Sequence, residues 1–305
     1  MMKVSVIIPA YNCQDFIQST INSVINQTYP QELIEVIIVN DGSTDNTTTI
    51  LNSYKDSFKI IHTENKGVSH ARNTGLANAT GDFIQYLDAD DLLESKKIEI
   101  QVQALLANKA DVAYGNWERF LEINSKIHVT KKVIRRMQGD PKIALFTDFW
   151  CPPAALLYSK KIAKEIGPWK EWLPVIQDAR YFLDAALHNA KFIYTDYNVA
   201  YYREGNPNSL SKKLTLFALD RYKNTLDIAK IWSHELSFNP DKREALVNNL
   251  GAIIPNLRHL PLKKHVHAIK KLLMIDPNFR PITKARHLVS IIGFKNTELL
   301  LRYLK

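Results

Sequence analysis

Unbroken apolar runs alternate with helical-period patterns along the first part of the chain. Runs rich in β-branched residues predict buried strands near residues 4–9, 36–39, 59–62, 83–87 and 112–114. Apolar side chains at helical spacing predict helices over 14–27 and 68–79. A third helix is expected to begin at an N-cap, Thr44 or Asp45, and to end at about residue 54. A fourth is expected to begin after Ser95 as N-cap and to end at about residue 108. This alternation is typical of an α/β domain with a mostly parallel sheet flanked by helices.

The alternation loosens between residues 131 and 202. The pattern there predicts helices over 140–149 and 178–189, and strands near 154–158, 192–194 and 199–202. After residue 211 the pattern predicts no strand, and helical segments are punctuated by prolines. We therefore expect two domains, an α/β domain over 1–211 and a mainly helical C-terminal extension over 212–305.

Polar clusters follow four of the predicted strands. They read AYN, NDGSTD, NKG and DADD, at residues 10–12, 40–45, 65–67 and 88–91. Ligands of open α/β sheets bind beyond the carboxyl ends of the strands, so these four loops are expected to converge on one site.

The DADD loop, residues 88–91, gathers three carboxylates behind an apolar strand. Asp88 and Asp90 are two apart on an extended segment, so both side chains can face one divalent cation. Carboxylate oxygens suit Mg²⁺ or Mn²⁺. The alternative is a solvated acidic turn in which Asp91 or Ser95 caps the next helix. The three neighbouring polar loops favour the metal site, and Asp91 is expected to point away from it and begin that helix.

The other loops carry groups that suit a nucleotide. Asp41 can accept the ring N–H of a uracil, although its neighbour Gly42 is explained equally well by a turn. Tyr11 either offers a flat face on which a base can stack or is an ordinary core aromatic residue. Arg72 either contacts a phosphate or base or forms a surface ion pair. Because the chain has neither GxGxxG nor GxxxxGK, a carboxylate-held metal is the expected means of neutralising a diphosphate.

Composition excludes other classes of protein. The hydrophobic share of 46% is ordinary for a globular chain and excludes disorder and collagen-like architecture. The two cysteines form no CxxC, which predicts free thiols in a reducing compartment and neither a disulfide framework nor a zinc site. No apolar stretch approaches the about 20 residues that span a bilayer, and the N-terminal run is expected to be a strand, not a signal peptide. We expect a cytoplasmic protein.

Six segments, in this order and spacing, resemble family 2 glycosyltransferases of the GT-A fold. They are VSVIIPAYN, VNDGSTDNT, NKGVSHARNTGL, YLDADD, IQDARYFLDAAL and YYREGNPNSLS. The resemblance covers roughly residues 3–211 and implies a Rossmann-like, mostly parallel sheet. It also implies an inverting transferase that moves a sugar from a nucleotide-sugar donor to a hydroxyl group.

The resemblance implies a role for each matching residue in nucleotide binding. The implied set is Pro9, Tyr11, Asp41, Arg72, Asp88 and Arg203. Tyr11 would stack on the base and Asp41 would hydrogen-bond it, with Arg72 close by. Asp88 would hold the ribose. Arg203 would lie near the diphosphate or near a closing C-terminal segment.

The resemblance also implies the reacting groups. Asp90 would ligate Mn²⁺ or Mg²⁺ at the diphosphate, and Asp178 would be the catalytic base that takes the proton of the acceptor hydroxyl. The chain departs from the family at Gln177, where an acidic residue usually precedes the base. This amide could change acceptor contacts or the pKa of Asp178.

The implied substrates are a UDP-sugar and a glycan or lipid-linked glycan acceptor, as in cell-surface polysaccharide synthesis. Two alternatives stay open. A metal-dependent nucleotidyltransferase would need a glycine-rich basic loop that the chain lacks. A non-catalytic scaffold of the same fold is disfavoured by the intact Asp41, Asp88, Asp90 and Asp178.

The formal net charge of +9 comes entirely from the C-terminal part. Residues 1–214 hold 24 basic and 24 acidic side chains, whereas residues 215–305 hold 16 and 7. In the predicted helix 262–275, Leu262, Val266, Ile269, Leu272 and Leu273 share one face and the lysines lie mostly opposite. Such a helix either contacts an anionic membrane, here on its inner face, or packs on the α/β domain; packing is favoured. Few aromatic residues interleave the basic ones, so nucleic acid is not an expected partner.

Overall fold

A computed structural model describes residues 2–123, 126–206, 210–235, 239–281 and 286–303. The chain divides into two compact units, Met1–Asn208 and Ser209–Lys305. Each unit is described by itself.

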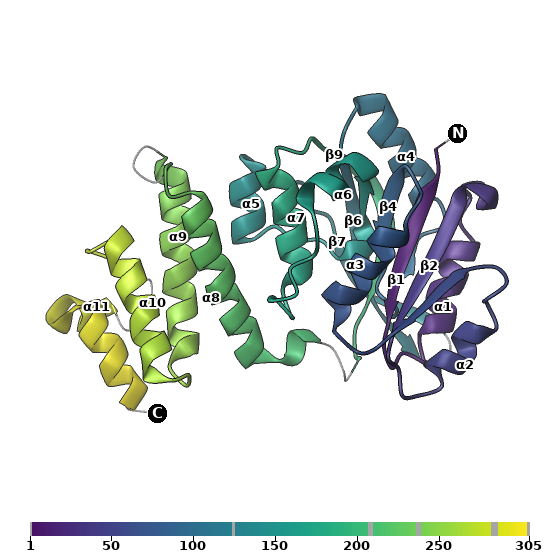
Figure 1. The fold of residues 1–305 in the computed structure, drawn as a ribbon. Coiled ribbons are helices and arrows are strands. Elements are labelled where there is room, and N and C mark those ends of the chain that lie inside the picture. The colour runs from purple at the N-terminus through teal and green to yellow at the C-terminus, as the bar shows by residue number, and fades with distance from the viewer. Residues whose placement is uncertain (1, 124–125, 207–209, 236–238, 282–285, 304–305) are drawn as a thin grey trace. The chain divides into compact units, whose positions relative to one another are not determined.

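The first unit is built on one sheet (Figure 1), with the strand order β3-β2-β1-β4-β8-β6-β9-β5. The first four neighbours are β1 (Val4–Ala10), β2 (Ile34–Asp41), β3 (Lys59–Thr63) and β4 (Phe83–Tyr86). They are parallel, with Val4 opposite both Ile34 and Phe83. The carboxyl ends of these four strands therefore lie at one edge of the sheet, as the sequence predicts.

The other half of the sheet is mixed. It contains β5 (Leu92–Leu93), β6 (Val112–Ile123), β7 (Lys126–Val133), β8 (Leu156–Ser159) and β9 (Phe192–Arg203). Strand β8 runs antiparallel to both β4 and β6, while β9 runs parallel to β6. The predicted α/β fold with a mostly parallel sheet flanked by helices is confirmed, with antiparallel pairs confined to this half.

Three strand predictions differ from the structure. The strand predicted at 112–114 extends to Ile123 and forms a hairpin with β7, which the sequence analysis missed. The strands predicted at 192–194 and 199–202 are one strand, β9. The residues between them belong to β9, whose register with β6 shifts near Asn116. Pairing with a neighbour thus decides where these strands end.

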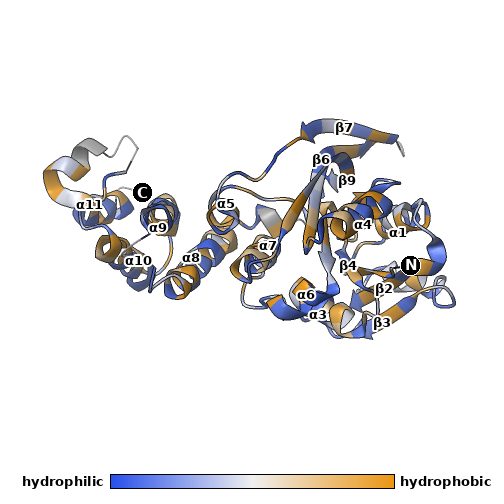
Figure 2. Ribbon diagram, turned by 90° about the horizontal axis from the view of Figure 1, so that it is seen from above, coloured by the Kyte–Doolittle hydropathy of each residue, from blue (hydrophilic) through white to orange (hydrophobic). Residues whose placement is uncertain are grey.

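Helices cover both faces of this sheet. They are α1 (Ile17–Ile25), α2 (Thr47–Asn52), α3 (Val68–Asn78), α4 (Lys97–Asn108), α5 (Pro141–Thr147), α6 (Lys160–Ile166) and α7 (Gln177–Leu187). Figure 2 shows α1 and α4 on one side of the sheet and α3 and α6 on the other.

The cap predicted at Ser95 is wrong. Helix α4 begins two residues later, and the Ser95 hydroxyl donates to Glu94 instead. Of the two candidates for α2, Asp45 accepts a hydrogen bond from the N–H of Thr47, the first residue of that helix. Both cysteines are free and buried, as expected, and burial raises the pKa of each thiol to about 12.

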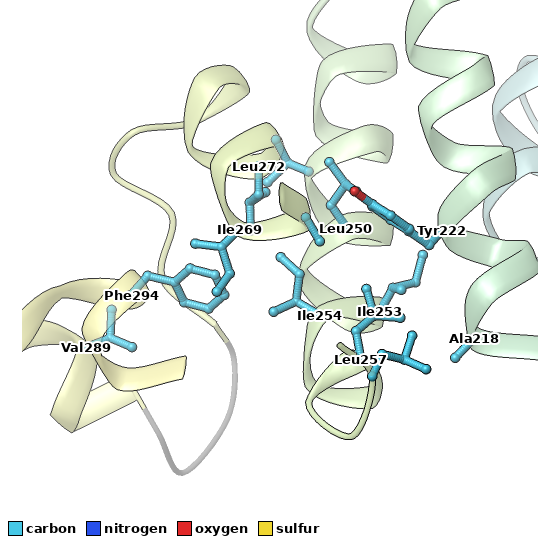
Figure 3. Close-up of a cluster of buried hydrophobic side chains, with 13 residues drawn as sticks. Ala218, Tyr222, Leu250, Ile253, Ile254, Leu257, Ile269, Leu272, Val289 and Phe294 are labelled. Atoms are coloured by element: carbon cyan, nitrogen blue, oxygen red, sulfur yellow. The ribbon is translucent and has the colours of Figure 1, made fainter. Parts of the chain in front are cut away.

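The second unit has a hydrophobic core of its own (Figure 3). Its helices are α8 (Leu214–Ile231), α9 (Pro240–Ile253), α10 (Leu262–Ile275) and α11 (Arg286–Tyr303), and none of its described residues lies in a strand. Ile269 and Leu272 of α10 are fully buried in this core, whereas Leu262, predicted on the same face, is 42% exposed. The centre of the apolar face of α10 therefore packs inside this unit. No helix in the described part of the chain is long and apolar enough to span a membrane.

Helix α3 packs against β1 through a close approach at Gly75. A Cβ atom added there would lie 2.3 Å from Cγ2 of Ile7. We expect Gly75→Ala to lower the unfolding free energy by about 1–3 kcal/mol through overpacking, which outweighs the about 1 kcal/mol gained in helix propensity. Thermal unfolding followed by circular dichroism measures the effect. Ala77→Ser, on the exposed side of the same helix, is the control; equal melting temperatures for the two variants would contradict the predicted clash.

Candidate active site

The loops after β1, β2 and β3 are joined by side-chain to backbone hydrogen bonds. The Asn12 side-chain oxygen accepts from the N–H of Thr44 at 2.8 Å. The Asp41 carboxylate is buried and accepts from the backbone N–H groups of Lys66 at 3.0 Å and Gly67 at 2.8 Å. Gly42 has a φ of 71°, and a Cβ there would lie 2.8 Å from Asn65 N, so this turn requires glycine. The predicted convergence of these loops is confirmed.

The residues predicted to hold a base differ in exposure. Tyr11 is 49% exposed, which excludes a core aromatic and leaves its ring available. Pro9 is buried within β1, opposite Val39 of β2. Asp41 Oδ1 accepts hydrogen bonds from the Thr63 hydroxyl and from the N–H of Lys66, whereas Oδ2 accepts one, from the N–H of Gly67, and so retains a lone pair. Binding of a nucleotide by these residues stays a prediction.

Arg72 is buried, so the alternative of a surface ion pair is wrong. Its side chain is 1% exposed, and one Nη forms an ion pair with Asp88. The guanidinium carbon lies 4.2 Å from the centre of the Trp169 ring, which in turn stacks on Tyr181 at 4.1 Å. Arg72 Nε and its second Nη have no hydrogen-bond partner among the described residues. Arg72 therefore carries a positive charge, partly uncommitted, next to the acidic loop.

Asp91 does not begin the next helix, so that prediction is wrong. The residue is buried, and its Oδ1 accepts from the backbone N–H of Arg203 at 2.9 Å. Strand β5 follows it, and α4 begins only at Lys97. Asp91 instead ties the acidic loop to the end of β9.

Arg203 reinforces this connection. Its Nε donates to the backbone carbonyl of Asp90 at 2.7 Å, and Nη1 donates to Glu122 at 2.7 Å. The second Nη donates to the hydroxyl of Ser19 at 3.3 Å. The guanidinium group is thus engaged with protein atoms from β6, α1 and the acidic loop. These contacts favour a role in shaping the loop.

The acidic loop concentrates negative charge in a partly desolvated place. Burial, followed by the charge of Asp88, raises the pKa of Asp90. Burial and the charges of Asp90 and Asp88 raise the pKa of Asp91 well above its usual range. Asp90 Oδ2 accepts from Asn206 at 2.7 Å, while Asp91 Oδ2 has no hydrogen-bond partner in the described part of the chain. This electrostatic environment fits a bound cation.

The donor set fits Mg²⁺ or Mn²⁺ only in combination with other ligands. Within the residues that the structure describes, no group of three or more His, Cys, Asp or Glu side chains is arranged to hold a metal. Magnesium commonly takes one or two carboxylates and completes its shell with water and phosphate oxygens. Asp90 is the predicted ligand of this kind.

Asp178 lies in the first turn of α7, on the same site. Its Oδ2 accepts from the indole N–H of Trp150 at 2.9 Å, and its Oδ1 accepts from the N–H of Ala179 at 2.8 Å. Burial raises the pKa of Asp178, and the positive charge of Arg72 opposes this shift most strongly. Gln177 beside it is buried, and its side-chain oxygen has no partner among the described groups. Arg72 therefore acts on both Asp88 and Asp178.

Three aromatic residues at this site escaped the sequence analysis. Trp117, Trp150 and Tyr202 contact one another edge to face. Burial and the charges of Asp91, Asp88, Asp178 and Asp90 raise the pKa of Tyr202. The only available signal for Tyr202 was its position next to Arg203. Trp117 and Trp150 lie in stretches without a recognisable motif.

The fold matches those of solved structures. The structure matches S. aureus TarS 1–349, solved with UDP-GlcNAc, with a TM-score of 0.60 and 19% identity, over 100% of this chain and 93% of that one. It also matches the mannosyltransferase PcManGT from Pyrobaculum calidifontis, solved with GDP-Man and Mn²⁺, with a TM-score of 0.57 and 16% identity, over 100% and 86% of the two chains. At these identities the matches show the fold alone.

The chain belongs to glycosyl transferase family 2, whose model matches residues 5–167. It is 43% identical over 119 residues to an Escherichia coli protein named UDP-Glc:alpha-D-GlcNAc-diphosphoundecaprenol beta-1,3-glucosyltransferase WfaP, covering 38% of this chain and 47% of that protein. It is 37% identical over 123 residues to glycosyltransferase GlyA of Streptococcus pneumoniae, covering 39% and 17%. The matched segments span between 17% and 62% of the first curated relatives. The predicted family is confirmed.

The contacts of Arg203 predict a large effect on stability. Arg203→Met leaves Asp91 and Glu122 without a nearby positive charge and should lower the unfolding free energy by about 3 kcal/mol. Urea unfolding measures the loss. Arg119→Met is the matched control, because Arg119 also lies at the β6–β9 pair but forms a half-exposed ion pair with Glu204, expected to contribute at most about 1 kcal/mol. Equal losses would show that Arg203 does not hold the loop.

Proposed function

We propose that this protein is an inverting, metal-dependent glycosyltransferase. It transfers a sugar from a UDP-sugar to a hydroxyl group of a glycan or lipid-linked glycan acceptor. The observation that carries the proposal is the position of Arg72, whose charge acts on both Asp88 and Asp178. The acidic loop and the candidate base thereby belong to one site. Residues 1–211 would be the catalytic domain and residues 212–305 an extension of it.

The nucleotide would occupy the edge formed by the first four loops. Tyr11 offers an exposed ring for stacking on the base, and Asp41 retains a lone pair for its N–H. Asp88 would hold the ribose. Arg72 has two nitrogen atoms without a hydrogen-bond partner among the described residues, and these could donate to the nucleotide. Arg203 would act on the diphosphate indirectly, by fixing the backbone of the acidic loop.

The proposed reaction is a single displacement. The acceptor oxygen forms a bond to the anomeric carbon as the bond from that carbon to the diphosphate oxygen breaks on the opposite face. Asp178 takes the proton of the acceptor hydroxyl, and the electron pair of the broken bond leaves with the nucleoside diphosphate. Burial raises the pKa of Asp178, which makes the carboxylate a stronger base than a free aspartate. Asp90 would hold Mn²⁺ or Mg²⁺, whose charge stabilises the leaving diphosphate when bound.

The relatives support the choice of substrates. The printed name of the E. coli relative specifies UDP-Glc as donor and a diphosphoundecaprenol-linked acceptor. A structure with the same fold was solved with UDP-GlcNAc, and another with Mn²⁺. A nucleotidyltransferase would release pyrophosphate, and a scaffold would release nothing, so the released product distinguishes both alternatives from the proposal.

Asp178→Asn is expected to abolish turnover and to leave nucleotide binding near the wild-type level. The side chain keeps its size, and its amide oxygen can still accept one of the two hydrogen bonds, but it cannot take a proton from the acceptor. UDP release from UDP-Glc and UDP-GlcNAc with Mn²⁺ measures turnover, and the thermal shift caused by UDP with Mn²⁺ measures binding. In the wild type, activity should fall with decreasing pH at a midpoint above about 3.9, because protonation of the base occurs at its raised pKa.

The matched control is Asp148→Asn, an exposed carboxylate two residues from Trp150. It should retain wild-type turnover. Near-normal turnover by Asp178→Asn would refute the role of Asp178 as base.

We further propose that the second unit contacts anionic membranes mainly through charge. Ile269 and Leu272 of α10 are buried in the core of this unit, whereas Lys263, Lys264 and Lys270 are exposed. Such lysines are attracted to anionic lipid by about 1 kcal/mol each. Contact at the inner face of a membrane, by a protein of the cytoplasm, would bring the active site to a lipid-linked acceptor.

Cosedimentation with phosphatidylcholine vesicles, with and without phosphatidylglycerol, tests this contact. Binding should require phosphatidylglycerol, weaken with salt, and be lost when Lys263, Lys264 and Lys270 are replaced by Glu. Replacing the exposed Lys55 and Lys59 of the first unit by Glu is the control. Absence of binding at low salt would exclude the membrane proposal.

A further inference from the structure

The indole N–H of Trp150 is directed at the candidate base. Trp150 lies between α5 and β8, and its Nε1 is 2.9 Å from Oδ2 of Asp178. We propose that Trp150 is a positioning residue, which fixes the orientation of the Asp178 carboxylate for proton transfer. This inference rests on the proposed function of Asp178.

The Trp150 ring is held in place by two other aromatic rings. It meets Trp117 of β6 at 5.5 Å between centroids and an angle of 90°, and Tyr202 of β9 at 5.8 Å and 89°. Trp117 and Tyr202 also contact each other, at 5.7 Å and 71°. Three segments that are distant in sequence therefore fix one ring. Because edge-to-face pairs resist rotation of the ring, the direction of the N–H is set by packing.

The hydrogen bond leaves the carboxylate free to react. Trp150 donates to Oδ2 and the Ala179 backbone donates to Oδ1, so each oxygen is fixed by one donor and keeps a second lone pair. An indole N–H can only donate, so its contact favours the ionised carboxylate, which is the form a general base requires. Loss of this donor would allow the carboxylate to rotate and would favour its protonation.

Other charged or titratable groups also face Asp178. They are Arg72 of α3, Asp88 after β4, Tyr158 of β8 and Tyr202 of β9. Arg72 acts through its charge, whereas Trp150 contributes a directed hydrogen bond. Removal of the indole N–H should therefore change both the orientation and the protonation of Asp178 while leaving the positive charge of Arg72 in place.

A binding surface for the acceptor is the competing role for Trp150, since aromatic faces pack on sugar rings. The two roles predict different kinetics. Trp150→Phe retains an aromatic face but removes the N–H. Loss of positioning should lower kcat by about tenfold or more, with little change in KM, and should move the acid limb of the pH profile upward by about one unit. If Trp150 served only as a packing face for the acceptor, the aromatic ring retained in Trp150→Phe would leave kcat and the pH profile near the wild-type values.

The contact itself can be tested without turnover. The chain has five tryptophans, so an ¹⁵N NMR spectrum has five indole N–H signals, and Trp150→Phe identifies one of them. That signal should shift with pH in the wild type as Asp178 is protonated, and it should lose this dependence in Asp178→Asn. A signal that does not titrate, or that titrates equally in Asp178→Asn, would overturn the proposal.

Kinetics of UDP release from UDP-Glc and UDP-GlcNAc then test the consequence. Trp172→Phe, a substitution at an exposed tryptophan outside the site, is the control and should behave as wild type. Wild-type kcat and pH profile for Trp150→Phe would overturn positioning. Turnover retained by Asp178→Asn would instead refute the proposed base, so the two failures are distinguishable.

Discussion

The active-site edge of the first unit depends on how negative charge is compensated there. Asp88, Asp90 and Asp91 follow one buried strand, and Asp178 reaches the same place from α7. The positive charges of two buried guanidinium groups offset the repulsion among these carboxylates. Arg72 pairs with Asp88 and acts on Asp178, and Arg203 holds the backbone of Asp90 while lying near Asp91. Removing a buried charge from such a set leaves the remaining charges uncompensated, which costs several kcal/mol.

The two arginines connect chemistry to architecture. Arg72 is supported by Trp169, which stacks on Tyr181, so the packing between α3 and α7 determines where its charge lies. Arg203 lies at the end of β9 and bonds to side chains of α1 and β6. The mixed half of the sheet therefore shapes the acidic loop that follows the parallel half. Both halves are needed to build one site.

In the second unit, the amphipathic pattern of α10 contributes to a hydrophobic core. The amphipathic face of α10 could have faced a membrane or another part of the protein. Ile269 and Leu272 lie in the core that the unit forms from α8, α9, α10 and α11. Arg258, in the segment that follows α9, forms a bidentate salt bridge with Glu298 of α11, with N–O distances of 2.6 and 2.8 Å. Ile269 and Leu272 are thereby unavailable to a membrane, whereas Lys263, Lys264 and Lys270 of α10 remain exposed.

The sequence by itself determined the parallel half of the sheet, the four converging loops and the acidic residues among them. These features depend on local patterns: buried runs, helical spacing and polar residues at strand ends, which report structure over only a few positions. Long-range contacts decided the rest. Asp91 is buried because it receives the N–H of Arg203, 112 positions away. Trp150 points at Asp178 because Trp117 and Tyr202 hold its ring. Strand β9 continues between the two strands predicted from the sequence because β6 pairs with it. Each outcome depends on a partner that is distant along the chain, and only tertiary packing determines which distant residues meet.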